Sequence, residues 1–234
     1  MSYIGSDKIG SLYLGSEKIG KAYLGNDLVY SVSTSLPSGY KECEYIFNNY
    51  YGGQAAYIST GVKGSSELRI VAKLAVEQDS SKIWPFIFGC RGANNYPNYT
   101  LYSYNTYPLY SITVSGSNFK NSTWRTQSTS PHTIDLNKHR LIFDGVEHPS
   151  ETSSTWTSNL IFDIFGFNNN GSRGEGSPVC KCYYFKMYDG NTLVRDYVPA
   201  YEESSGKYGL YDLVNNTFSS SGYNNRQLTG LIKT

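Results

Sequence analysis

The chain has 234 residues, enough for one large domain or two small ones. Its 20 basic and 19 acidic residues give a formal net charge of +1 and form no basic run, so nucleic acid is not expected as a partner. The amino terminus lacks the features of a signal peptide, and no stretch approaches the ~18 apolar residues of a membrane helix, so we expect a protein made in the cytosol and not inserted in a membrane.

The first 32 residues repeat with a period of ten. The runs YIGSDKI, YLGSEKI and YLGNDLV begin at Tyr3, Tyr13 and Tyr23. Their Gly-Ser and Gly-Asn steps supply turn chemistry, which predicts a strand over 8–14 between two turns. Because so short a segment buries no core of its own, we expect residues 1–32 to serve attachment or oligomerisation. The positions expected to carry that role are Tyr3, Ile9, Tyr13, Ile19, Tyr23 and Val29.

A polar segment at 33–39, STSLPSG, predicts a hinge between this repeat and the remaining residues 40–234. Beyond the hinge, short β-branched and aromatic runs alternate with Gly, Asn, Ser and Pro clusters. Such spacing favours one antiparallel sandwich or barrel, with hairpin turns at Asp144-Gly145 and Asp189-Gly190-Asn191. The strands are expected at 43–47, 55–59, 68–76, 85–90, 100–104, 110–114, 123–127, 133–136, 140–143, 160–167, 180–188, 192–198 and 208–213.

The four cysteines fit no zinc spacing and no disulfide framework, and we expect them to be buried free thiols: Cys43, Cys90, Cys180 and Cys182. The three histidines are scattered, and no phosphate-binding glycine loop opens a helix. The polar loops carry Asn rather than Asp, which is poor for calcium. We therefore expect neither a metal nor a cofactor.

Several runs resemble bacteriophage virion proteins. Residues 36–46, LPSGYKECEYI, are similar to the opening LPSGYTELEYIES of that family, and 56–61 and 88–91 look like its QYIDTG and FGAR steps. The most specific runs are FKMYDGNTLVRDYVP at 185–199 and GLYDLVNNTF at 209–218, which match KIYDNGTLVRDFVP and GLYDLVNGKFY. The resemblance covers roughly 36–222, and the N-terminal YLGS repeats look like those that precede such domains.

This resemblance implies an all-β fold, an antiparallel jelly-roll sandwich of the concanavalin A-like (laminin-G-like) type, in a fibre or appendage on the virion. It also implies a homo-oligomer, with a trimer expected, held to other virion proteins through residues 1–32. The sandwich would face outward and bind host-surface polysaccharide. Two alternatives stay open: a purely structural head or tail decoration without a ligand, and a glycan depolymerase.

The carboxylates argue against an enzyme. Jelly-roll glycosidases usually place their acids on one strand as Glu-x-Asp-x-Glu or Glu-x-Asp-x-x-Glu, and the chain has neither pattern. Asp163 is the one acid in an apolar strand. It could be a paired core acid, a metal ligand or a catalytic group.

Glycan binding is expected in loops that depart from the family pattern. The segment 94–129 is rich in Tyr, Asn, Ser and Thr, and the departures concentrate in a loop at 94–99, with a second polar loop at 168–173. Strands 86–91 and 160–167 lead into these loops with similar ends, FGCR and FGFN, so the two loops are expected to form one surface. Aromatic rings would stack on a sugar, amides would bond its hydroxyls, and an arginine would contact an acidic sugar. These residues are Asn95, Tyr96, Tyr99, Asn169 and Arg173.

Overall fold

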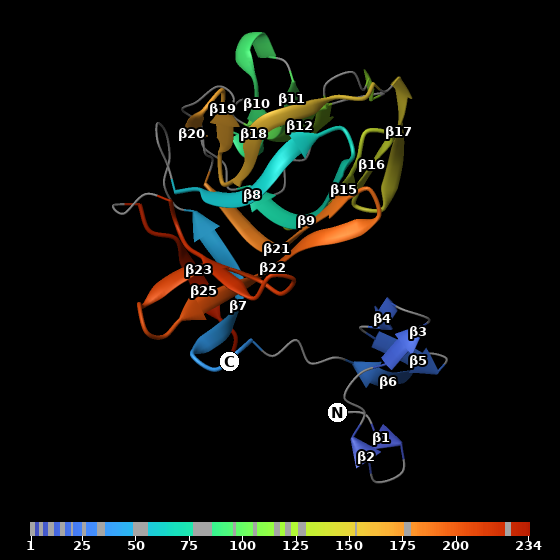
Figure 1. Cartoon of the computed structure of the whole chain (residues 1–234), viewed down its shortest axis with the longest axis vertical. Helices are drawn as coiled ribbons and strands as arrows, with labels where there is room; N and C mark the ends of the chain where they lie inside the picture. The colour runs from blue at the N-terminus through green and yellow to red at the C-terminus, as the bar shows by residue number, and fades with distance from the viewer. Residues whose placement is uncertain are drawn as a thin grey trace. The chain divides into compact units, whose positions relative to one another are not determined.

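A computed structural model of the chain shows two compact units, Met1–Pro37 and Ser38–Thr234 (Figure 1). The boundary falls inside the segment 33–39 that the sequence predicts as a hinge. The structure describes residues 3–4, 7–8, 12–14, 17–19, 21–24, 27–31, 36–48, 56–76, 86–95, 97–104, 107–114, 118–119, 123–125, 130–152, 154–175, 179–222 and 226–234.

In the N-terminal unit each ten-residue repeat forms its own antiparallel hairpin. The partners Ile4 and Asp7 close the first hairpin across two residues, and equivalent pairs close the other two. The strand expected over 8–14 is instead divided between β2 and β3, which belong to separate two-stranded sheets, while 9–11 lie outside the described residues. The strands are β1 (Tyr3–Ile4), β2 (Asp7–Lys8), β3 (Leu12–Leu14), β4 (Glu17–Ile19), β5 (Lys21–Leu24) and β6 (Asp27–Ser31). Tyr3, Tyr13, Ile19, Tyr23 and Val29 lie in these strands, and Ile9 lies outside the described residues.

The second unit contains two sheets. The smaller runs in the order β14-β12-β11-β10-β18-β8, and β19 joins β10 in the one parallel pairing among the described strands. The short helix η1 (Ala93–Asn95) follows β10. The strands of this sheet are β8 (Ile58–Ser65), β10 (Phe86–Arg91), β11 (Asn98–Tyr104), β12 (Tyr107–Val114), β14 (Thr123–Arg125), β18 (Thr157–Ile164), β19 (Phe167–Asn169) and β20 (Ser172–Glu175).

The larger sheet runs in the order β13-β17-β16-β15-β9-β21-β7-β22-β23-β24, and β25 pairs with β7. Its strands are β7 (Tyr40–Asn48), β9 (Leu68–Val76), β13 (Asn118–Phe119), β15 (His132–Leu136), β16 (Arg140–Phe143), β17 (Val146–Thr152), β21 (Cys180–Asp189), β22 (Thr192–Glu202), β23 (Lys207–Asp212), β24 (Thr217–Ser219) and β25 (Thr229–Ile232).

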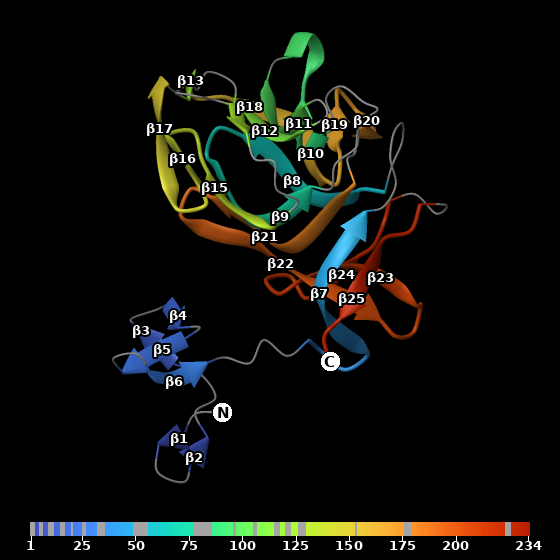
Figure 2. The ribbon, with the colours of Figure 1, turned by 180° about the vertical axis from the view of Figure 1, so that it is seen from behind.

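The two sheets form a sandwich with one shared hydrophobic core (Figure 2). The ring of Phe88 on β10 meets that of Phe185 on β21 edge to face, with ring centroids 5.3 Å apart. The side chains of β9 alternate between the core and the outer face of the sheet. Leu68 and Ile70 are buried, while Arg69 between them lies on the outer face. The fold is all-β, as predicted, and consistent with a jelly roll. Within the described residues no helix is long and apolar enough to cross a bilayer.

The strand expected over 160–167 is interrupted. β18 ends at Ile164, and Phe165 and Gly166 both adopt positive φ, at 62° and 138°. Their backbone N–H groups both donate to the Ile87 carbonyl, which turns the chain into β19. This prediction was wrong because an apolar run does not reveal a reversal held by one distant carbonyl. Strands β13, β17, β20, β24 and β25 were missed, because their sequences lack a regular apolar pattern. The strand expected over 55–59 lies later in the chain, as β8.

Both predicted hairpin turns are confirmed. Phe143 pairs with Val146 across Asp144 and Gly145, and Asp189 pairs with Thr192 across Gly190 and Asn191. Asp144 and Gly145 both have positive φ, the backbone that a two-residue hairpin with the matching twist requires.

The cysteines are buried free thiols, which confirms the prediction. Burial raises the pKa of the Cys43 thiol to about 11 and that of the Cys90 thiol to about 12. Both groups are therefore protonated near neutral pH and behave as small apolar side chains.

Candidate functional site

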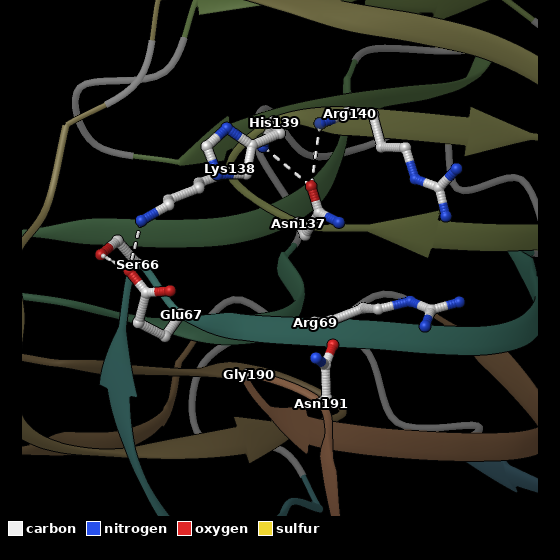
Figure 3. Close-up of a pocket in the computed structure, with 9 residues that line it drawn as sticks. All are labelled: Ser66, Glu67, Arg69, Asn137, Lys138, His139, Arg140, Gly190 and Asn191. Carbon is white, nitrogen blue, oxygen red and sulfur yellow. Dashed lines mark hydrogen bonds and ion pairs between the residues drawn. The ribbon is translucent and has the colours of Figure 1, made fainter.

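Three turns of the larger unit meet at a cleft of about 400 Å³. Its lining comes from the β8–β9 turn at 66–67 with the following Arg69, from the β15–β16 turn at 137–139 with Arg140, and from Gly190 and Asn191 between β21 and β22 (Figure 3). These segments are far apart in the sequence. The register of β15, β9 and β21 in the larger sheet brings their ends together.

Local hydrogen bonds hold the turns in place. The Asn137 Oδ1 atom accepts the backbone N–H groups of His139 and Arg140, at 2.8 and 2.9 Å. This is the Asx arrangement that favours Asn in turns. The Gly190 N–H donates to the Glu67 carbonyl at 3.2 Å, so the β21–β22 turn is tied to the β8–β9 turn. The cleft is therefore built on rigid hairpins, which suits a binding site on a sandwich.

One end of the cleft carries two guanidinium groups beside one carboxylate. Arg69 donates to Asp135 through two parallel hydrogen bonds of 2.7 Å. Arg140 lies 3.7 Å from the same carboxylate and 3.8 Å from Glu147, both longer than a hydrogen bond. At the other end Lys138 pairs with Glu67, and this contact lowers the pKa of the Glu67 carboxyl.

The two predicted recognition loops leave the smaller sheet side by side. Cys90 pairs with Asn168 and Arg91 with Asn169 in the parallel β10–β19 ladder. The Asn170 N–H then donates to the Arg91 carbonyl at 2.7 Å. The structure thus brings the FGCR and FGFN strand ends together, as the sequence analysis expected.

The prediction that Tyr99 stacks on a sugar is wrong. Tyr99 lies inside the core with 0% exposure, in edge-to-face contact with the rings of Phe162 and Trp156. Its hydroxyl donates to the carbonyls of Leu68 and Leu136, which lie 3.2 and 3.1 Å away. Burial raises the pKa of this hydroxyl well above its usual value. A polar loop precedes Tyr99, but the alternation of β11 turns its ring inward.

The acidic-sugar contact expected of Arg173 stays a prediction. Its guanidinium forms a two-point ion pair with Asp163, which is completely buried, and lies 5.1 Å from the centre of the Tyr57 ring. Arg173 is an internal counter-charge, and of the three interpretations of Asp163 the paired core acid is confirmed.

The remaining predicted residues are placed in part. The Asn169 side chain accepts a hydrogen bond from Arg91 at 3.3 Å. The Arg91 guanidinium in turn lies over the rings of Phe167 and Phe86, at 4.8 and 5.4 Å. The backbone of Asn95 lies in η1, and Tyr96 lies outside the described residues.

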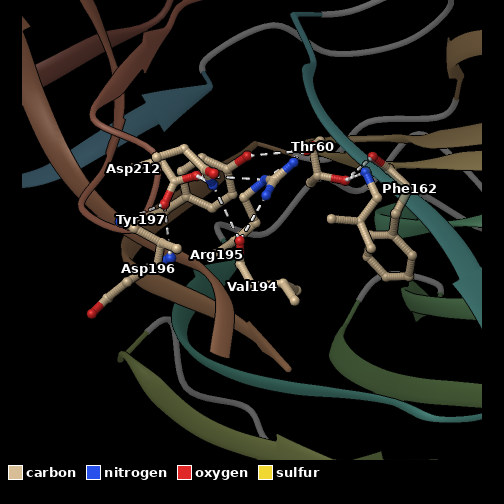
Figure 4. A network of polar contacts seen from close by, with 10 residues as sticks. Thr60, Phe162, Val194, Arg195, Asp196, Tyr197 and Asp212 are labelled. Atoms are coloured by element: carbon tan, nitrogen blue, oxygen red, sulfur yellow. Dashed lines mark hydrogen bonds and ion pairs between the residues drawn. The ribbon is translucent and has the colours of Figure 1, made fainter. Parts of the chain in front are cut away.

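The most specific runs of the sequence contribute residues to a structural polar network (Figure 4). The Arg195 Nε atom donates to the Thr60 carbonyl at 2.9 Å and lies 3.5 Å from the buried Asp212 carboxylate. That carboxylate also accepts the N–H groups of Asp196 and Val214. Arg195 therefore links β22 to the last residue of β23, Asp212, and to β8 of the opposite sheet.

Sequence reasoning missed the cleft. The lining residues come from ordinary turns and from the first residues of β9 and β16. The available signal was only that two turns, at 137–139 and 190–191, carry Asn with basic neighbours or glycine. Within the described part of the chain, no group of three or more His, Cys, Asp or Glu side chains is placed to hold a metal ion.

No protein-family model matches the chain, and a search of curated proteins finds no match to it. The resemblance to bacteriophage virion proteins therefore stays a prediction, which rests on the sequence runs at 36–46, 56–61, 88–91, 185–199 and 209–218.

Proposed function

We propose that the chain is a structural subunit of a bacteriophage virion, in a fibre or appendage, and that its sandwich binds host-surface glycan through the cleft. The observation that carries the binding role is the cleft itself, a cavity of about 400 Å³ whose lining includes amide, guanidinium, ammonium and carboxylate groups. Such groups hydrogen-bond sugar hydroxyls, and their fixed hairpins limit the ordering cost of binding.

The carboxylates favour binding over cleavage. A glycosidase needs two carboxyl groups about 5–9 Å apart across its substrate. The lining of the cleft includes one carboxylate, Glu67, which pairs with Lys138. The buried Asp163 and Asp212 are each held by an arginine.

The N-terminal hairpins support an assembly role. The pairs β1–β2, β3–β4 and β5–β6 form separate two-stranded sheets. Hairpins this small are marginal alone, and open strand edges favour pairing with another chain. We propose that residues 1–32 complete one another's sheets in a homotrimer and attach it to other virion proteins.

The test of binding uses the full chain on a glycan array and on host cells. Asn191→Trp places a bulky ring at the exposed rim of the cleft, and we expect it to abolish binding. The matched control is Ser204→Trp, at an exposed turn between β22 and β23, which should bind like the natural protein. Wild-type protein that binds no host surface contradicts the glycan-binding role and favours a purely structural decoration. Release of reducing ends from host polysaccharide favours the depolymerase.

A further inference from the structure

We infer that one end of the cleft receives the carboxylate of an acidic sugar; this rests on the proposed glycan-binding function and names its ligand class. This donor end of the cleft consists of the side chains of Arg69, Arg140 and Asn137. All three side chains line the cleft (Figure 3).

The two arginines carry more positive charge than the carboxylate between them balances. Both lie within 4 Å of the one carboxylate of Asp135, whose side chain is only 17% exposed. The second neighbour of Arg140 is Glu147, whose side chain is 56% exposed and stands 3.8 Å away, so water screens this pair. A carboxylate of a ligand can therefore replace a weak, solvated contact of Arg140.

Hydrogen-bonding capacity points the same way. The hydrogen bonds from Arg69 to Asp135 use two of its five N–H donors. The contacts of Arg140 at 3.7 and 3.8 Å are too long for hydrogen bonds. Two guanidinium groups thus present unused donors, and guanidinium matches carboxylate geometry.

Asn137 adds a donor of fixed orientation. Its Oδ1 atom accepts two backbone N–H groups, which settles which side-chain atom is oxygen and which is nitrogen. Figure 3 shows the nitrogen turned toward the side on which the guanidinium groups of Arg69 and Arg140 lie. Donors from three side chains therefore lie toward the same end of the cleft, which suits an anion.

The opposite end of the cleft differs in charge. Lys138 and Glu67 form a pair of balanced charge, and the Ser66 hydroxyl lies beside them. A pair of this kind offers both donors and acceptors, as sugar hydroxyls require. The cleft is therefore asymmetric, and a uronic or sialic acid fits it with its carboxylate at the donor end and its ring hydroxyls toward Glu67.

The deciding variant is Asn137→Asp in the full chain. Aspartate keeps the oxygen that accepts the two backbone N–H groups, so the turn is retained, but it replaces the donor with a negatively charged oxygen. The matched control is Asn159→Asp, which makes the same charge change at an exposed position of β18. Arg140→Gln is a second variant that removes charge without burying a group.

The ligands are oligosaccharides of glucuronate, galacturonate and N-acetylneuraminate, each with its carboxyl-reduced neutral counterpart and a sulfated neutral glycan. We expect the natural protein to bind at least one of the acidic oligosaccharides, and to bind its carboxyl-reduced form about 10- to 100-fold more weakly. Asn137→Asp and Arg140→Gln should lower the affinity for the acidic form by a similar factor. Asn159→Asp should leave that affinity unchanged. In NMR titrations with free glucuronate, the arginine Nε–H signals of Arg69 and Arg140 should shift, and with methyl glucoside they should not.

Equal binding of the acidic and reduced forms overturns the acidic-sugar inference and leaves glycan binding intact. Tighter binding of the sulfated glycan overturns the assignment to a carboxylate. Absence of binding to every glycan, neutral or charged, overturns this inference and the proposed function together. Unchanged affinity in Asn137→Asp, with the protein folded by circular dichroism, shows that the donor end does not hold the ligand.

Discussion

Asp163 and Arg173 form a two-point ion pair, with 2.7 Å between Arg173 Nε and Asp163 Oδ2. The carboxylate is completely buried, and the arginine side chain is 24% exposed. Asp163 lies on β18 and Arg173 on β20. β20 pairs with β19, and β19 in turn pairs with β10. The pair therefore fastens the short β19–β20 hairpin to the body of the smaller sheet.

Arg173→Met should lower the free energy of unfolding by about 3–5 kcal/mol, because it removes a two-point counter-charge from the completely buried Asp163 carboxylate. Urea denaturation measures the change. The control is Lys233→Met, which breaks an exposed pair with Glu42 and should cost no more than about 1 kcal/mol. Combining Arg173→Met with Asp163→Leu should recover much of the loss, since no charge then stays buried. An effect of Arg173→Met as small as the control's would contradict the structural role.

Tyr99→Phe should destabilise the protein by about 1–3 kcal/mol, because it removes the donor that serves two buried carbonyls. Glycan binding should not change. Tyr208→Phe is the control, since Tyr208 is only partly buried and the structure shows no hydrogen bond from its hydroxyl to the described residues. Thermal unfolding of both variants, followed with a binding assay, checks the prediction. Loss of binding without loss of stability would return Tyr99 to the recognition surface.

Asp144→Asn tests the pH dependence of stability. Burial alone would raise the pKa of Asp144, but hydrogen bonds from His132, 2.5 Å away, and from Thr133 outweigh it and lower the pKa. A lowered folded-state pKa stabilises the protein above the usual value of 3.8, and this contribution disappears as the pH falls through the folded pKa. Asparagine keeps the positive φ of this turn without strain.

The natural protein should therefore be more stable than Asp144→Asn at pH 7, and the difference should shrink on acidification. Urea denaturation of both proteins at a series of pH values measures it. A difference that stays constant, or grows as the pH falls, would contradict the sign of the shift.

Removal of residues 1–37 should leave a folded sandwich with weaker self-association. The reason is that the unit Ser38–Thr234 contains its own core and both sheets. Circular dichroism and sedimentation velocity of the truncated and full chains test this. Unfolding of the truncated chain, or a monomeric full chain, would contradict the proposed assembly role.

Local patterns in the sequence were enough to predict much of the fold. The alternation in 68–76 and the Asp144-Gly145 step predict β9 and the β16–β17 turn, because each depends on residues that are neighbours in sequence. The break at Phe165 could not be predicted in this way. It depends on the Ile87 carbonyl, which lies far away in the chain.

The candidate site was much harder to predict. Tyr99 follows a polar loop as a surface aromatic would, and only the register of β11 against β10 shows that its ring enters the core. The sequence gives no sign that Arg173 has a partner. Asp163 comes ten residues earlier, and the two side chains meet only because the chain reverses between them. The cleft was missed altogether, since Arg69, Asn137 and Asn191 meet only once the larger sheet has formed.

The self-contained pairing of the N-terminal repeats bears on how such a segment can change during evolution. Ile4 pairs with Asp7, Leu14 with Glu17 and Leu24 with Asp27, so among the described strands of this segment each repeat pairs within itself. Duplication or loss of a ten-residue unit therefore leaves the register of every other hairpin unchanged. The length of this segment can vary by recombination without any compensating substitution in the sandwich.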